Sequence, residues 1–349
     1  MANVFVDASL FAVPPADAGR ARLATYIRSL VRWSRLRRES WLRVCTSERS
    51  SRLFSASRHF PIRCRLDESM TANGFVAADV ETICRCSGEV LGWPKFEEIV
   101  GVSDVLWTEG SLCLDPETFL ANVPRDLVDE SKRTVCMLAL ARACAPPSVG
   151  LWCFVAAVGV AGRQPVNVRA GLDLADMTGD WAGSDISFPY NLQSWVPVCD
   201  ALDDPEQVLD PADCWGDGSD SGAVRTAVLL AGVQLSRELG RNASIASLPR
   251  LDVHREFCTS LCPDGFDTER PKIERLLRTA ASVLVGHDRD KDEPLRKSRG
   301  GNAPARMRGS DEARRCDIDY EYHLHYWKLA GGGYELAHLA HHNDFSIPL

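Results

Sequence analysis

The sequence lacks a long apolar run and a basic segment at its start. No run approaches the ~20 apolar residues that a helix needs to cross a bilayer, so we expect no membrane association. The opening residues, MANVFVDASLF, lack the basic region of a secretory signal, which predicts a cytoplasmic protein. In that reducing compartment we expect the 13 cysteines to remain free thiols.

Cysteine spacing also argues against a zinc site. One residue separates Cys84 from Cys86, three residues separate Cys258 from Cys262, and no CxxC pair occurs. A structural metal held by Cys258, Cys262 and His254 is a minor alternative. We therefore expect no cofactor.

Charge is distributed unevenly beneath a net charge of -8. Residues 1–65 contain 13 basic residues (Lys and Arg) and 4 acidic residues (Asp and Glu), and residues 66–269 contain 13 basic and 32 acidic residues. Residues 270–316 contain 13 basic and 7 acidic residues, and residues 317–349 contain 1 basic and 5 acidic residues. An anionic polymer responds to local potential, so the two basic segments are candidate surfaces for nucleic acid, RNA above all. The alternative is that their arginines are solvated faces of amphipathic helices.

A chain of 349 residues exceeds a typical single core, which favours two or three domains. We expect an α/β domain over residues 1–199 and an acidic loop with a connecting helix over residues 200–250. A smaller α+β domain over residues 251–349 should end in an antiparallel hairpin.

The first 46 residues alternate strand and helix. Residues 3–6 predict a strand that ends at Asp7, residues 14–38 a helix opened by two prolines, and residues 41–46 a second strand. This order resembles the opening of PIN-like metal-dependent nucleases. The resemblance implies a Mg²⁺ or Mn²⁺ site centred on Asp7, completed by later carboxylates. The alternative is that Asp7 is a helix cap or turn residue.

The middle of the chain holds two apolar segments. Residues 132–144 predict a mostly buried helix, because charged residues are few and the apolar set is wide. Residues 151–160 are a short continuous apolar run and predict a buried strand. Residues 166–174 partly alternate, and we expect this strand to pair near the previous one.

The end of the chain predicts a β-hairpin rich in histidine. Alternating aromatic residues in segment 320–326 lead to three glycines at 331–333 and to a second alternating segment. Five of the eight histidines lie within residues 323–342. Strand alternation places His323 and His325 on one face and Tyr322 and Tyr326 on the other, so these side chains cannot all serve one site.

The expected helix at 269–285, the basic loop at 287–301 and the hairpin resemble the RelE/ParE-type toxin fold. In that family a strand carrying an arginine pairs with a strand of the form RLxY, and the last strand ends near GHR. Here Arg314 and Arg315 precede the first strand, EYHLHY takes the place of RLxY, and LAHH takes the place of the GHR end. His342 therefore stands where the family has its functional arginine.

The resemblance implies cleavage of RNA without a metal, as in a toxin-type or defence-type endoribonuclease. This chemistry needs a general base, a general acid and cations that stabilise the charged phosphorane. Imidazole titrates near neutrality and arginine binds phosphate through two N–H groups. The predicted catalytic residues are Arg315, His342 and His341. The predicted nucleic-acid-binding residues, for phosphate contacts and base stacking, are Arg299, Arg306, Arg308, Arg314 and Tyr322.

For the single residues of the hairpin, the alternative is that the tyrosines are core residues, the histidines half-buried strand residues and the arginines solvated. Three alternatives stand beside the hypothesis as a whole. The protein can be a non-catalytic nucleic-acid-binding or protein-interaction subunit of a bacterial defence or toxin system, with a regulatory protein as a partner. The protein can instead be a metal-dependent nuclease centred on Asp7. A metal held by His338, His341, His342 and Asp344 is the third alternative, although adjacent histidines on a strand point apart.

Overall fold

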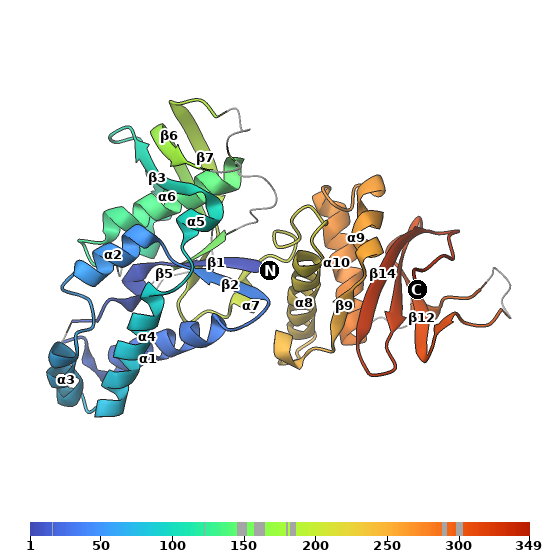
Figure 1. Cartoon of the computed structure of the whole chain (residues 1–349), viewed down its shortest axis with the longest axis horizontal. Helices are drawn as coiled ribbons and strands as arrows, with labels where there is room; N and C mark the ends of the chain where they lie inside the picture. The colour runs from blue at the N-terminus through green and yellow to red at the C-terminus, as the bar shows by residue number, and fades with distance from the viewer. Residues whose placement is uncertain are drawn as a thin grey trace. The chain divides into compact units, whose positions relative to one another are not determined.

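The computed structural model describes residues 1–15, 17–121, 123–144, 152–156, 165–178, 181, 186–287, 292–297 and 303–349. The chain divides into two compact units, which we call the N-terminal unit (residues 3–204) and the C-terminal unit (residues 205–349 with residues 1–2) (Figure 1). The first is mixed α/β, and the second is a smaller α+β unit that ends in an antiparallel hairpin. The expected fold class is confirmed.

The N-terminal unit alternates strands and helices before it adds antiparallel strands. Its strands are β1 (Ala2–Val6), β2 (Leu42–Cys45), β3 (Val102–Trp107), β4 (Cys113–Asp115), β5 (Trp152–Ala156), β6 (Val166–Met177), β7 (Tyr190–Val196) and β8 (Val198–Asp200). Its α-helices are α1 (Gly19–Leu36), α2 (Glu48–Ala56), α3 (Arg63–Ala72), α4 (Ala77–Leu91), α5 (Phe96–Val100) and α6 (Val128–Cys144).

Two sheets form in this unit, and the burial patterns of their strands differ. The first has the order β2-β1-β5-β8, with β5 parallel to both β1 and β8. All five residues of β1 are buried, as expected for a strand covered on both faces. The second sheet is antiparallel, with β6 paired to β3, β4 and β7. The expectation that residues 166–174 pair near residues 151–160 is therefore wrong, because β6 alternates in burial and joins the antiparallel sheet.

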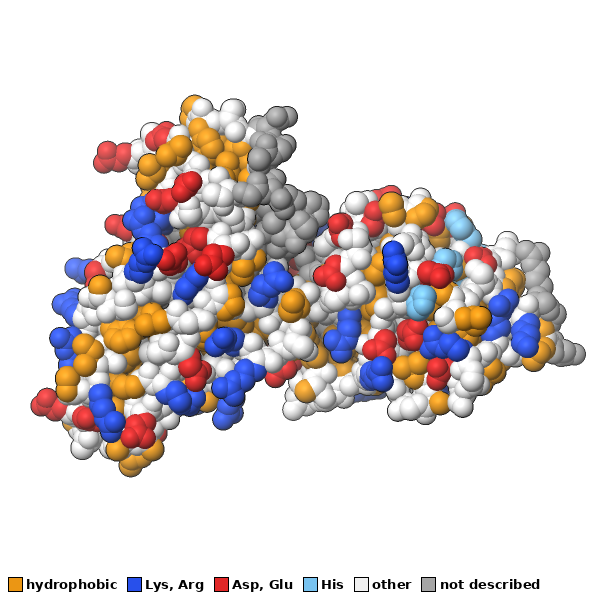
Figure 2. Space-filling model, in the orientation of Figure 1, with side chains coloured by type: hydrophobic (Ala, Val, Ile, Leu, Met, Phe, Trp, Pro, Cys, Tyr) orange, Lys and Arg blue, Asp and Glu red, His pale blue; other side chains and the backbone are white. Residues whose placement is uncertain are grey.

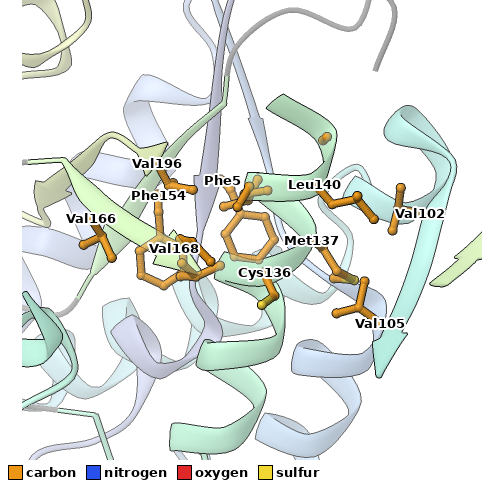
Figure 3. Close-up of a cluster of buried hydrophobic side chains, with 14 of the residues drawn as sticks. Phe5, Val102, Val105, Cys136, Met137, Leu140, Phe154, Val166, Val168 and Val196 are labelled. Carbon is orange, nitrogen blue, oxygen red and sulfur yellow. The ribbon is translucent and has the colours of Figure 1, made fainter. Parts of the chain in front are cut away.

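Helix α6 contributes side chains to a core shared by both sheets. Cys136, Met137 and Leu140 are at most 1% exposed and belong to one cluster with Phe5 and Phe154, whose rings stack at 5.8 Å (Figure 3). Burying a side chain of this size contributes roughly 1.5–3 kcal/mol relative to leaving it in water. The prediction of a mostly buried helix is confirmed. Of residues 151–160, the described part is β5, and the rest lies outside the described residues.

The C-terminal unit contains four α-helices and six strands in its described ranges. The helices are α7 (Pro205–Val208), α8 (Ser221–Glu238), α9 (Arg255–Leu261) and α10 (Arg270–Val285). The strands are β9 (Leu251–Val253), β10 (Asp292–Pro294), β11 (Met307–Arg308), β12 (Asp311–Asp317), β13 (Tyr322–Lys328) and β14 (Tyr334–His341).

These strands form one sheet of order β10-β12-β13-β14-β9, with β11 paired to β12. Neighbours are antiparallel except for β14 and β9, which are parallel. Helices α8 and α10 pack one face of the sheet through a core that includes Leu229, Leu276 and Leu324. Residues 200–250, expected as a connecting segment, supply α8 to this core, because its apolar side chains are buried against α10.

Three further features of the described residues bear on function. None of the helices in the described ranges combines the length and the apolar character that a membrane span requires. All 13 cysteines are free thiols. His254 caps α9 by accepting a hydrogen bond from the backbone N–H of Glu256, which is its role in the fold.

Candidate active site

Strand β13 presents two chemically different faces. Tyr322, Leu324 and Tyr326 lie in the apolar core beneath α8 and α10. His323 and His325 alternate with them and lie on the opposite face, where they are 1% and 0% exposed. The division that sequence alternation predicted is confirmed, and the face that carries His323 and His325 is called the histidine face below.

A row of three side chains crosses the histidine face. Asp317 of β12 lies opposite His323 of β13, and Nδ1 of His323 is 2.7 Å from Oδ1 of Asp317. The ring nitrogen and the carboxylate oxygen are close, but the direction of the contact is not that of a hydrogen bond. Nε2 of His323 and Nδ1 of His342 are 2.9 Å apart and share a hydrogen bond. The row therefore connects a carboxylate, a buried imidazole and an exposed imidazole.

The carboxylate sets the position of the protons along this row. A negative charge beside Nδ1 of His323 favours a proton on that nitrogen, so its Nε2 accepts the hydrogen bond from Nδ1–H of His342. The lone pair of His342 is then on Nε2, which makes no hydrogen bond or ion pair with any of the described residues. Burial lowers the pKa of His323, although the charge of Asp317 opposes this effect. A neutral His323 thus orients an exposed imidazole that is able to accept a proton.

Arg315 provides a cation on the same face. It lies opposite His325 in the pairing of β12 with β13, and its positive charge contributes to the lowered pKa of His323. One Nη of Arg315 donates to Oε2 of Glu293 at 2.9 Å. Its guanidinium also lies 5.9 Å from the ring centre of Phe345. The structure therefore brings together two of the predicted catalytic residues, Arg315 and His342, around His323.

Residues 343–349 run over the rest of the histidine face. Nδ1–H of His325 donates to the carbonyl of Ser346 at 2.8 Å, and Nε1–H of Trp327 donates to the carbonyl of Pro348 at 2.9 Å. Ile347 is 7% exposed and packs in a small apolar cluster with Trp327. Burial lowers the pKa of His325 to about 4. His325 is therefore a neutral, buried residue with a structural role.

The third predicted catalytic residue, His341, lies apart from His342. Its Nε2 is 3.5 Å from Oδ1 of Asp264, the same oxygen that accepts a hydrogen bond from Tyr322 at 3.2 Å. The rings of Tyr322 and His341 are 4.9 Å apart at their centres. Burial, followed by the contact with Asp264, raises the pKa of Tyr322 to about 12. His341 and Tyr322 therefore belong to the helix-covered side and not to the histidine face.

Two of the predicted phosphate-binding arginines have carboxylate partners. Arg308 pairs with Glu335 at 2.7 Å and with Asp311 at 3.3 Å, and the hydrogen bond to Glu335 is the main cause of its raised pKa. Arg314 pairs with Asp292 at 2.7 Å. Figure 2 shows basic and acidic side chains interspersed over the visible face of this unit. These two guanidinium groups are thus neutralised within the fold.

The other two predicted phosphate-binding arginines are Arg306 and Arg299. Nε of Arg306 donates to the backbone carbonyl of Arg296 at 3.4 Å, and no carboxylate of the described residues pairs with it. Arg299 lies outside the described residues. Arg306 is the one predicted phosphate-binding arginine among the described residues that has no acidic partner.

Asp7, the centre of the alternative metal site, is buried at the end of β1. Its charge acts on Glu130, whose pKa is raised mainly by burial. Arg49 lies 2.9 Å from Glu130 and 3.2 Å from Asp104, and Arg133 donates to Asp104 at 2.5 Å. The described residues contain no group of three His, Cys, Asp or Glu side chains placed to hold a metal ion. Arg49 and Arg133 each lie between Glu130 and Asp104 instead.

Comparison with protein-family models, with curated proteins and with solved structures found no match for this chain. The geometry of the histidine face therefore carries the functional argument. Sequence reasoning did not single out Asp317 or assign a role to His323. The available signal was the two-residue period, because Asp317 and Arg315 share a face of β12 as His323 and His325 share a face of β13.

Proposed function

We propose that the protein is a metal-independent endoribonuclease of the toxin or defence type that acts through the histidine face. One observation carries the proposal: Asp317 and His323 orient an exposed His342 whose Nε2 is free to accept a proton. The expected resemblance of the C-terminal residues to RelE/ParE-type toxins is part of the same proposal.

In the proposed reaction, Nε2 of His342 removes the proton of a ribose 2′-hydroxyl. The 2′-oxygen attacks the adjacent phosphorus, the bond to the 5′-oxygen breaks, and that oxygen leaves with a proton from water. Arg315 stabilises the charge that develops on the phosphorane through its N–H groups. The guanidinium must exchange its contact with Glu293 for the phosphate, and Glu293 is exposed, which keeps the cost of that exchange small.

A second candidate function is binding of nucleic acid or of a regulatory protein without catalysis. The observation that favours it is the neutralisation of Arg308 and Arg314 by Glu335 and Asp292. A nuclease with few free cations binds its substrate weakly, because phosphate contacts supply most of the affinity. Binding that falls steeply with salt and is not followed by cleavage would select this function.

The test compares cleavage of single-stranded RNA, duplex RNA and single-stranded DNA by the full chain, with and without EDTA. We expect RNA alone to be cut, in EDTA as well, and to leave 2′,3′-cyclic phosphate ends because the nucleophile is the neighbouring hydroxyl. Cleavage that depends on a divalent ion would instead support the site at Asp7.

Variants then locate the activity on one face of the sheet. His342→Ala and Arg315→Ala should each lower the cleavage rate by about 10²-fold or more, the usual contribution of a general base or of a donor to the transition state. Asp317→Asn should lower it less. His341→Ala is the matched control, because this adjacent histidine lies on the other side of the sheet. Equal rates for the wild type and His342→Ala would refute the proposal.

A further inference from the structure

A cavity of about 1140 Å³ opens within the N-terminal unit. Helix α1, the segments 10–15 and 58–62, the start of α3, and residues 121 and 123–125 line it. Its volume slightly exceeds the range of roughly 300–1,000 Å³ that is typical of small-molecule sites. The cavity has no part in the proposed reaction at the histidine face, so its chemistry requires a separate account.

The floor of the cavity is apolar. Leu10, Leu66 and Val123 are between 2% and 7% exposed. The hydroxyl groups that reach the floor are used within the fold: Tyr26 donates to the carbonyl of Phe11 at 2.9 Å, and Ser29 donates to the carbonyl of Tyr26 at 2.7 Å. Thr25 also lines the cavity, and its hydroxyl accepts a hydrogen bond from Arg28 at 3.0 Å. The floor therefore offers mainly hydrocarbon surface.

The rim of the cavity is cationic. Arg22, Arg58, Arg65 and Arg125 are exposed along it, and the described residues that line the cavity include no Asp or Glu. The guanidinium groups of Arg22, Arg65 and Arg125 make no hydrogen bond or ion pair with any residue in the described ranges.

A carboxylate next to this rim, that of Asp126, already has a partner. Asp126 lies 3.1 Å from Nε2 of His59, and Arg58 contacts the same nitrogen at 3.4 Å. Three arginines thus remain available to a ligand. They contrast with Arg308 and Arg314 of the C-terminal unit, both of which have carboxylate partners.

We propose that this cavity binds an anionic amphiphile, a molecule with a hydrocarbon body and one carboxylate or phosphate head. The hydrocarbon body covers the floor, since burying each CH₂ group contributes about 0.8 kcal/mol. The head lies at the rim, where arginine forks match the planar geometry of carboxylate and phosphate oxygens. A nucleotide fits less well, because its base needs several hydrogen-bond partners and the hydroxyls of Tyr26 and Ser29 are already used within the fold.

Calorimetric titration of the full chain tests the proposal, with each probe kept below its micelle concentration. Decanoate and decyl phosphate carry the two head groups, decyltrimethylammonium reverses the charge, decanol removes it, and AMP represents a nucleotide. We expect decanoate or decyl phosphate to bind at least ten-fold more tightly than the other three. Whichever of decanoate and decyl phosphate binds more tightly identifies the head group. Added salt should reduce the difference in affinity between that probe and decanol, because salt screens the charge of the arginines.

Two kinds of variant place the binding in this cavity. The double variant Arg65→Glu with Arg125→Glu should weaken binding at least ten-fold, whereas Arg35→Glu, an exposed arginine of α1 outside the cavity, should change it less than two-fold. Ala21→Trp adds bulk at an exposed lining position and should also abolish binding without disturbing the core. AMP binding more tightly than both anionic amphiphiles, or unchanged binding in the double variant and in Ala21→Trp, would overturn the proposal.

Discussion

Replacing His325 by asparagine should remove a large part of the acid sensitivity of the C-terminal unit. An unfolded histidine, with its ordinary pKa of 6.5, takes up a proton below that pH, whereas burial lowers the pKa of His325 to about 4. Between these two values protonation favours the unfolded chain, so stability is lost as the pH falls from about 6.5 towards 4. Asparagine keeps an N–H donor for the carbonyl of Ser346 but does not titrate.

The size of this effect follows from the shift of the pKa. One pKa unit corresponds to about 1.4 kcal/mol, so the complete shift is worth about 3 kcal/mol, of which about 2 kcal/mol is expressed between pH 7 and pH 5. The lowered pKa of His323 adds a contribution of the same sign. The wild type should therefore lose at least that amount of unfolding free energy, and His325→Asn should lose about 2 kcal/mol less.

Hydrogen exchange in urea, followed on peptides that cover β13, measures the unfolding free energy of this unit within the full chain. Peptides that cover β1 of the N-terminal unit serve as an internal control in the same samples. An equal loss of stability between pH 7 and pH 5 in the wild type and in His325→Asn would refute the assignment of the proton uptake to this residue.

Three further substitutions test the packing of the same unit. Gly332 and Gly333 both have positive φ. A Cβ on Gly333 would lie 2.4 Å from the carbonyl oxygen of Arg250, whereas a Cβ on Gly332 would meet nothing within 4 Å. In urea denaturation, Gly332→Ala should therefore lower the unfolding free energy by about 1–2 kcal/mol and Gly333→Ala by clearly more. Leu276→Ala should cost about 2–5 kcal/mol, because this side chain is 0% exposed in the core beneath the sheet, and the loss of hydrogen-exchange protection should be confined to the C-terminal unit.

The terminal hairpin was predictable from the sequence because its signals are local. Alternation of side chains along 320–326 and the three glycines at 331–333 defined two strands and the turn, which the structure shows as β13 and β14. The same alternation placed the side chains of His323 and Tyr322 on opposite faces of the strand. Local patterns therefore established which side chains share a face, although not which of them touch.

The pairing of distant segments was not predictable in the same way. Strand β6 joins β3, β4 and β7 because its alternating face covers α6 and the rest of the core, and no feature of residues 166–174 identifies those partners. The contact of Asp317 with His323 likewise depends on the register between β12 and β13. A shift of one residue would exchange the faces of the whole strand, so a site of this kind becomes visible only when the register is known.

Charge counts along the sequence are a poor guide to potential for the same reason. Segments 1–65 and 270–316 each contain 13 basic residues, yet their arginines end in different surroundings. Arg308 and Arg314 meet carboxylates delivered by neighbouring strands, because a sheet brings side chains of opposite charge side by side. Arg22 and Arg65 of segment 1–65 stand at the rim of a cavity that is lined by no Asp or Glu of the described residues. These two arginines therefore place positive charge without an acidic partner beside an apolar floor, and an anion with a hydrocarbon body is the ligand that uses both.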